Sequence, residues 1–337
     1  MPEISVIMGL FNGRRYLPAT IASLNAQTFT DWELVLVDNG STDGSAELAQ
    51  TICPPEKLNL VREPKALGPA GALRRACEVA RGRFLAVLDS DDIALPNRFE
   101  IQRAFLINAP DVGLLGGLSQ LINADGVPGE LEPSPCTHDD IFGWSAYVHG
   151  IRHSTVFFRR ELLTTITYRD EFCSAADMDF IGQAVEHTRA AAVPVVVGQY
   201  RLHAGNLTVT NRPLVALCGG LARMTTRRRR LGFPENLKMW SARFRAIETK
   251  VGLTEAGVHI ECSRIFITEG YYDLAVLHAW HSWRTGPNGT ALWLYGVALI
   301  RGLVGSAEAR RGLLKALIKE PAHRLMRAQG TSERLQF

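Results

Sequence analysis

The chain has 337 residues, of which 46% are hydrophobic and 21% charged, and its formal net charge is +3. These values are ordinary for a globular protein, and the length allows one large domain or two smaller ones. The small net charge excludes an electrostatic argument for nucleic acid as a partner.

Three features of the sequence predict a cytoplasmic protein. The six cysteines are scattered and form no C-x-x-C pair, which favours reduced thiols. A first strand is predicted from Ile4, so we expect no signal peptide. The longest uncharged apolar run of the last third, residues 291–300, is shorter than the roughly 20 residues that span a bilayer.

In the first third of the chain, short apolar runs alternate with segments of helical periodicity. The predicted strands are residues 4–8, 33–37, 58–61 and 84–88. The predicted helices are residues 15–26, 45–51, 69–80 and 96–108. This alternation is typical of an α/β fold with a mostly parallel sheet flanked by helices.

A further strand is predicted at residues 112–118, and after it the regular alternation of strands and helices ends. We expect a hairpin over residues 120–131, strands at 155–158 and 193–197, and an amphipathic helix at 177–187. Beyond His203 the pattern is helical. The sequence thus predicts an α/β domain over residues 1–210 and a helical C-terminal region over residues 211–337.

The most informative stretch is residues 83–92, R-F-L-A-V-L-D-S-D-D. Its apolar run predicts a strand buried on both faces. On such a strand Asp89 and Asp91 point to the same side, and two carboxylates at the C-terminal end of a strand suit Mg²⁺ or Mn²⁺ holding a substrate phosphate. The alternative is an acidic turn with helix-capping aspartates before Pro96.

Six segments occur in an order that resembles the inverting glycosyltransferases of family 2, which have the GT-A fold. The resemblance covers about residues 4–210. Its segments are I-S-V-I-M-G-L-F-N-G, W-E-L-V-L-V-D-N-G-S-T-D-G-S, R-F-L-A-V-L-D-S-D-D, H-S-T-V-F-F-R-R, A-A-D-M-D-F and Y-R-L-H.

The chain departs from the family pattern at three positions. Gly9 stands where proline is usual, and Arg74 stands near the position of a usual asparagine. Ala176 replaces the glutamate that usually precedes the helix aspartate, which removes a carboxylate beside the expected catalytic base.

The resemblance implies a nucleotide-diphosphate donor, a UDP-sugar in the first place. Asp38, at the end of a strand, is expected to accept a hydrogen bond from the base, and Phe11 to stack on it. The alternative for Asp38 is capping of the turn at residues 41–43.

The resemblance also implies a divalent cation, Mn²⁺ or Mg²⁺, bridging the diphosphate oxygens. Asp91 is the expected ligand, and Asp89 reaches the ribose or a metal-bound water. His203 would complete the metal shell or contact the diphosphate.

Inverting transfer is a single displacement and needs a base for the acceptor hydroxyl. The resemblance assigns that role to Asp177, whose alternative is helix capping. Asp179 is expected to be a surface or capping charge. His153 and Ser154 are expected to line the acceptor side.

The helical region contains four consecutive arginines, residues 227–230, and much of the tryptophan. One interpretation is peripheral contact with the inner face of the membrane, or with a glycan or lipid-linked acceptor. In the other, Trp283, Trp293 and Tyr295 form the region's own core or a homodimer contact.

We therefore predict a metal-dependent inverting transferase in polysaccharide biosynthesis. A sugar-1-phosphate nucleotidyltransferase would show a G-x-G-x-R loop, and G-L-F-N-G-R-R lacks that spacing. A non-catalytic sugar-nucleotide or glycan-binding module is the other alternative.

Overall fold

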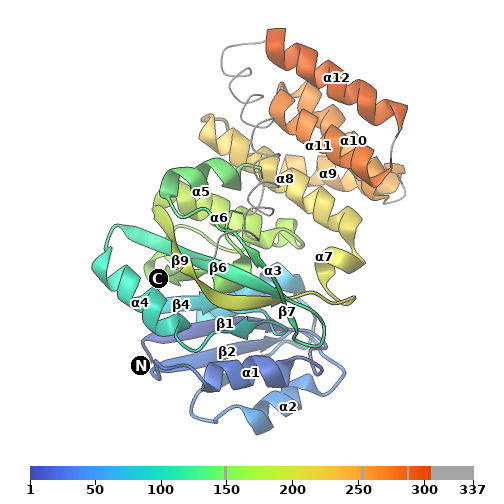
Figure 1. Ribbon diagram of the computed structural model, residues 1–337. Coiled ribbons are helices and arrows are strands. Elements are labelled where there is room, and N and C mark those ends of the chain that lie inside the picture. Colours follow the sequence, from blue (N-terminus) through green and yellow to red (C-terminus); the bar gives the residue numbers. More distant parts are fainter. Residues whose placement is uncertain (148–149, 252–253, 287, 305–337) are drawn as a thin grey trace. The chain divides into compact units, whose positions relative to one another are not determined.

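The computed structural model describes the chain except residues 148–149, 252–253, 287 and 305–337. The chain divides into two compact units, Met1–His203 (unit 1) and the segment from Ala204 onward (unit 2). Figure 1 shows the sheet in unit 1 and a set of helices in unit 2.

Unit 1 is built on one nine-stranded sheet with the order β3-β2-β1-β4-β8-β6-β9-β5, and β7 pairs with β6. The four strands predicted first, β3, β2, β1 and β4, pair in parallel. Beyond β4 the sheet is mixed, because β8 lies antiparallel between β4 and β6, while β6 and β9 are parallel. The strands are β1 (Ile4–Leu10), β2 (Trp32–Asp38), β3 (Leu58–Arg62), β4 (Phe84–Val87), β5 (Ile93–Ala94), β6 (Val112–Ile122), β7 (Pro128–Glu132), β8 (Phe157–Arg159) and β9 (Arg189–Arg201).

Helices cover both faces of this sheet (Figure 1). Strand β1 shows why: Ile7 packs in one apolar cluster, whereas Val6 and Met8 pack in another, because side chains alternate along a strand. Each such fully buried side chain contributes about 1.5–3 kcal/mol. The helices are α1 (Leu17–Asn25), α2 (Ser45–Ile52), α3 (Gly68–Val79), α4 (Arg98–Asn108), α5 (His138–Ser145) and α6 (Ala176–His187), with 3-10 turns at His153–Thr155, Arg160–Thr164 and Asp170–Phe172.

Unit 2 is helical in its described residues, and α10, α11 and α12 pack in sequence on one another. No helix in the described part of the chain is long and apolar enough to cross a membrane. The helices are α7 (Leu207–Thr210), α8 (Arg212–Arg230), α9 (Leu237–Val251), α10 (Glu255–Thr268), α11 (Tyr272–Thr285) and α12 (Gly289–Val304).

Helices α10 and α11 hold three imidazoles, which we call the histidine cluster: His259 and His278 are buried, and His281 is half-buried. The Nδ1 atoms of His259 and His278 are 3.0 Å apart, and Arg223 Nη1 lies 3.2 Å from His278 Nε2. Burial is the main cause of the lowered pKa values, about 3 for His259 and about 4 for His281. The cluster is therefore neutral at pH 7.

Candidate active site at the carboxyl edge of the sheet

Three neighbouring parallel strands end at one edge of the sheet. β1 ends at Leu10, paired in register with Asp38 at the end of β2, and β4 ends at Val87. The carboxyl edge of parallel strands is where open α/β sheets bind ligands. Phe11 and the acidic loop, residues 88–92, follow β1 and β4 directly.

The end of β9 and the turn before β8 hold the acidic loop. Ser154 Oγ donates to Asp89 Oδ2 at 2.8 Å and is also hydrogen-bonded to Asp92 Oδ2. The Arg201 backbone N–H donates to Asp92 Oδ1 at 2.8 Å, and the Arg201 Nε donates to the Asp91 carbonyl at 2.8 Å. These bonds fix the direction of the loop's side chains.

His203 lies against the acidic loop, as the sequence predicted for a shared site. Its Nε2 is 2.9 Å from Asp91 Oδ2. The imidazole also packs on Tyr16, with 4.5 Å between ring centroids. The structure thus brings Asp89, Asp91 and His203 together from β4 and β9.

The carboxylates of the loop are crowded and only partly neutralised. Burial and the charge of Asp89 raise the pKa of Asp91, and the hydrogen bond from His203 opposes that rise. Burial, followed by the charges of Asp91 and Asp89, raises the pKa of Asp92 well above its usual range. The Ser154 hydroxyl has one hydrogen but contacts two carboxylates. Both contacts can be hydrogen bonds when Asp92 carries a proton of its own.

A buried arginine lies beneath this loop, and the sequence analysis missed it. Arg98 is 0% exposed; its Nη2 donates to the carbonyls of Val87 (2.9 Å) and Val156 (3.2 Å). Its Nε donates to Gln102 Oε1 at 3.0 Å. Burial lowers its pKa to about 9, and the charges of Asp92 and Asp89 act in the opposite direction. The signal in the sequence is the Arg98–Gln102 pair, four residues apart on a helix that follows the aspartates.

The expected nucleotide side is formed by the ends of β1 and β2. Asp38 is 6% exposed, and its Oδ1 accepts from the Ser41 N–H at 3.0 Å, so the turn-capping alternative is realised in the structure. Phe11 is 61% exposed, which leaves its ring free for a ligand to cover. Asn12 Oδ1 accepts from the Thr42 N–H at 2.9 Å and joins the two loops.

Asp177 is the second residue of α6 and is half-buried. Near it in the fold is Tyr168, a buried residue whose hydroxyl lies 2.9 Å from His153 Nε2. Burial raises the pKa of Tyr168, and the charges of Cys77, Asp177 and Asp89 add to the rise. Asp177 and Asp89 therefore both act on one hydroxyl.

Asp179 is not the surface or capping charge that we predicted. It is 1% exposed and forms a two-point ion pair with Arg169, whose Nε is 2.8 Å from Asp179 Oδ2. Gln183 Nε2 also donates to Asp179 Oδ2 at 2.8 Å. Facing Arg169 rather than solvent, Asp179 has a structural role.

The four arginines at the end of α8 are also engaged within unit 2. Arg227 pairs with Asp273 at 3.3 Å, and Arg229 pairs with Glu235 at 2.5 Å. Arg228 Nε donates to the Pro234 carbonyl at 2.9 Å. Residues of unit 2 thus act as partners for arginines that we predicted to contact a membrane or an acceptor.

The donor set at the acidic loop fits a hard divalent cation. Among the described residues, no three His, Cys, Asp or Glu side chains gather as a complete metal site. Asp91 and His203 nevertheless face each other at an accessible edge, with side chains 24% and 14% exposed, and Asp89 is 42% exposed. A cation there would offset the excess negative charge, with the remaining ligands supplied by a phosphate or water.

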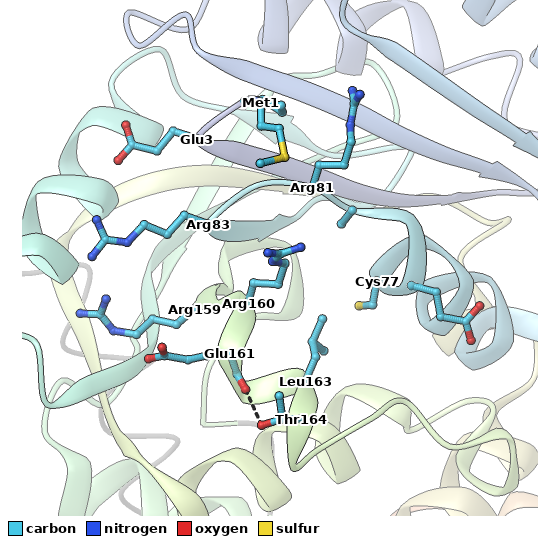
Figure 2. A pocket seen from close by; sticks show the side chains of 13 residues that line it. Met1, Glu3, Cys77, Arg81, Arg83, Arg159, Arg160, Glu161, Leu163 and Thr164 are labelled. Carbon is cyan, nitrogen blue, oxygen red and sulfur yellow. Dashed lines mark hydrogen bonds between the residues drawn. The ribbon is translucent and has the colours of Figure 1, made fainter.

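A separate pocket of about 770 Å³ lies at the opposite end of β4, among residues near the start of the strand (Figure 2). Several arginines line it, but Arg159 donates to the carbonyls of Val112 and Leu106, and Arg81 pairs with Glu33. This pocket is remote from the acidic loop because the two are at opposite ends of the same strand.

Comparisons with known proteins agree on one family. Residues 5–164 match the model of glycosyl transferase family 2. An uncharacterized glycosyltransferase of Methanocaldococcus jannaschii is 28% identical over 53% of this chain and 63% of its own length. The UDP-Glc:alpha-D-GlcNAc-diphosphoundecaprenol beta-1,3-glucosyltransferase WfgD of Escherichia coli is 30% identical over 49% of this chain. The match spans 63% of WfgD, so the chain spans less than two thirds of these two relatives.

The solved structures show a similar fold. Residues 1–349 of S. aureus TarS, in complex with UDP-GlcNAc, superpose with a TM-score of 0.59 at 18% identity. The superposition covers 89% of this chain and 91% of that one. The fold is therefore GT-A, the architecture of a class of sugar-transferring enzymes. Residues 5–164, just under half of the chain, form a family 2 glycosyltransferase domain, the family that the sequence predicted.

Proposed function

We propose that this chain is an inverting glycosyltransferase that moves a sugar from a UDP-sugar to a lipid-linked glycan acceptor, assisted by a divalent cation. The observation that carries the proposal is the acidic loop: three carboxylates at the carboxyl edge of the sheet, faced by His203 and held by Ser154 and Arg201.

The donor would occupy the edge formed by β1, β2 and β4. Phe11 offers an exposed ring for the base, and Asp38 has a second carboxylate oxygen besides the one that caps the turn. Asp89, whose side chain is more exposed than that of Asp91, would reach the ribose or a bound water. UDP is favoured because WfgD uses UDP-Glc and the TarS structure binds UDP-GlcNAc.

Asp91 and His203 would hold Mn²⁺ or Mg²⁺. When bound, the cation would supply positive charge to the departing diphosphate. Asp92, which is buried and has a raised pKa, and Arg98 beneath it would keep the loop in place when Asp91 and His203 give up their mutual hydrogen bond to hold the cation.

Asp177 would act as the general base. A single displacement requires one carboxylate to take the proton of the acceptor hydroxyl while that oxygen attacks C1. Asp177 lies at the start of α6, electrostatically coupled to the same Tyr168 hydroxyl as Asp89. Asp179 is unsuited to the role because Arg169 and Gln183 occupy its oxygens.

The test is transfer from labelled UDP-Glc and UDP-GlcNAc to a diphosphoundecaprenol-linked sugar, with and without Mn²⁺. We expect a lipid-extractable product, and magnetic resonance should show a β-linkage from the α-linked donor. An α-linked product would overturn inversion. Absence of UDP release from every UDP-sugar, with or without acceptor, would overturn the donor class.

A further inference from the structure

Helix α12 is apolar on both of its faces. Its inner face packs small residues and one leucine into the bundle: Ala291, Leu294, Ala298 and Gly302. Its outer face carries large apolar side chains that are 55–83% exposed: Leu292, Trp293, Ile300, Leu303 and Val304. A helix that is hydrophobic all round is normally covered on all sides, so the outer face requires a cover.

The exposed side chains form one stripe along the helix. Leu292 and Ile300 are eight residues apart, and Leu303 is three further on, which places them on the same side. Trp283, on α11, is 39% exposed and stacks on Trp280, whose ring is 6.3 Å from that of Tyr295 on α12. The stripe is thus bordered by aromatic rings, which favour the interface between lipid and water.

The charges of α11 and α12, and of the sequence that follows α12, favour an anionic surface. Arg301 is the one charged residue of α12, and Arg284 lies in the last turn of the preceding helix. The 33 residues that follow, 305–337, contain seven arginines and lysines against three glutamates. A basic segment adjoining an exposed apolar helix complements acidic lipid headgroups.

We infer that the outer face of α12 docks on an anionic lipid bilayer, lying in the headgroup region. This rests on the proposed function, because a lipid-linked acceptor is presented at such a surface. It moves the predicted membrane contact from the arginines of α8, which have partners in unit 2, to the apolar stripe of α12. A second copy of the chain, or residues 305–337 folded on the stripe, are the competing covers.

The experiment is co-sedimentation of the full chain with vesicles of phosphatidylethanolamine and phosphatidylglycerol, and with neutral phosphatidylcholine vesicles. Trp293→Gln combined with Ile300→Gln should lower the fraction bound to anionic vesicles at least tenfold. The matched control, Met239→Gln combined with Val195→Gln, alters two other exposed apolar side chains and should bind like wild type.

Equal sedimentation of the α12 variant and wild type would overturn the inference, as would absence of wild-type binding to anionic vesicles. A third contrary result is a solution mass of twice the chain's 37.1 kDa in wild type that falls to the mass of one chain in the variant. UDP-sugar hydrolysis, measured on the same samples, should be unchanged by both pairs of substitutions. Its absence in wild type would break the proposed function while leaving vesicle binding as it is.

Discussion

The acidic loop of unit 1 and the histidine cluster of unit 2 are both groups of three titratable side chains, but their surroundings have opposite effects. The imidazoles are buried or half-buried near Arg223, and their lowered pKa values keep them uncharged, so the cluster needs no counter-ion. The carboxylates of the loop repel one another, and Asp91 and Asp89 are accessible, so the loop has charge left to offset. The histidine cluster is uncharged and enclosed by unit 2, which suits a structural role. The acidic loop keeps negative charge at the edge of the sheet, which suits the binding of a ligand.

Asp177→Asn should give the largest effect. The amide retains the size of the side chain but cannot take the acceptor proton, so we expect transfer to fall by about 10²-fold or more with donor binding unchanged. Steady-state transfer and calorimetric UDP binding measure the two effects. Asp139→Asn, also in the first turn of a helix, is the matched control and should transfer normally. Undiminished transfer by Asp177→Asn would remove the base assignment.

Acid should destabilise unit 2 through the histidine cluster. The folded pKa of His281 is about 4 against an ordinary value of 6.5, so the unfolded chain binds more protons below pH 6.5. The contribution of the neutral histidines to the free energy of unfolding is fully present above pH 6.5 and is lost as the pH falls toward 4. At pH 5 the loss due to His281 alone is about 2 kcal/mol.

Thermal unfolding between pH 7.5 and 5 measures this loss. His281→Gln should flatten the pH dependence, whereas His187→Gln, at an exposed helix end of unit 1, should leave it as in wild type. A His281→Gln variant with the full wild-type slope would show that His281 does not contribute to the effect.

Ser154→Ala should give the smallest effect of these substitutions, and it tests whether the Ser154 hydroxyl orients the acidic loop. Removing the hydroxyl between Asp89 and Asp92 deletes one net hydrogen-bonded link, worth about 1 kcal/mol. Urea unfolding should detect this change, together with weaker UDP binding. Ser134→Ala, a part-buried serine bonded to the Gly150 carbonyl, is the comparison. Identical UDP affinity in Ser154→Ala and wild type would show that the loop is oriented without this bridge.

The sequence predicted the strands that position the site because their apolar runs are continuous and end in polar turns. It missed β5, since two residues between Asp92 and Pro96 carry no periodic signal. It also misjudged buried charge. Arg98 and Asp179 lie inside the fold, where they have hydrogen-bond partners: Arg98 donates to the Val156 carbonyl, 58 residues away, and Asp179 pairs with Arg169, ten residues away. The periodicity of the sequence does not predict such pairs. The roles of Asp38, Asp89, Asp91, His203 and Asp177 stay predictions until they are tested by substitution.

The most direct measurement is calorimetric titration of UDP with and without Mn²⁺, in wild type and in Asp91→Asn. Mn²⁺ should raise the wild-type affinity by at least about tenfold, and Asp91→Asn should abolish that gain, because an amide is a weak, uncharged ligand for a hard cation. Asp125→Asn, with an exposed carboxylate outside the acidic loop, should retain the gain. Wild-type Mn²⁺-dependent affinity in Asp91→Asn would contradict the assignment of the acidic loop as the cation and diphosphate site.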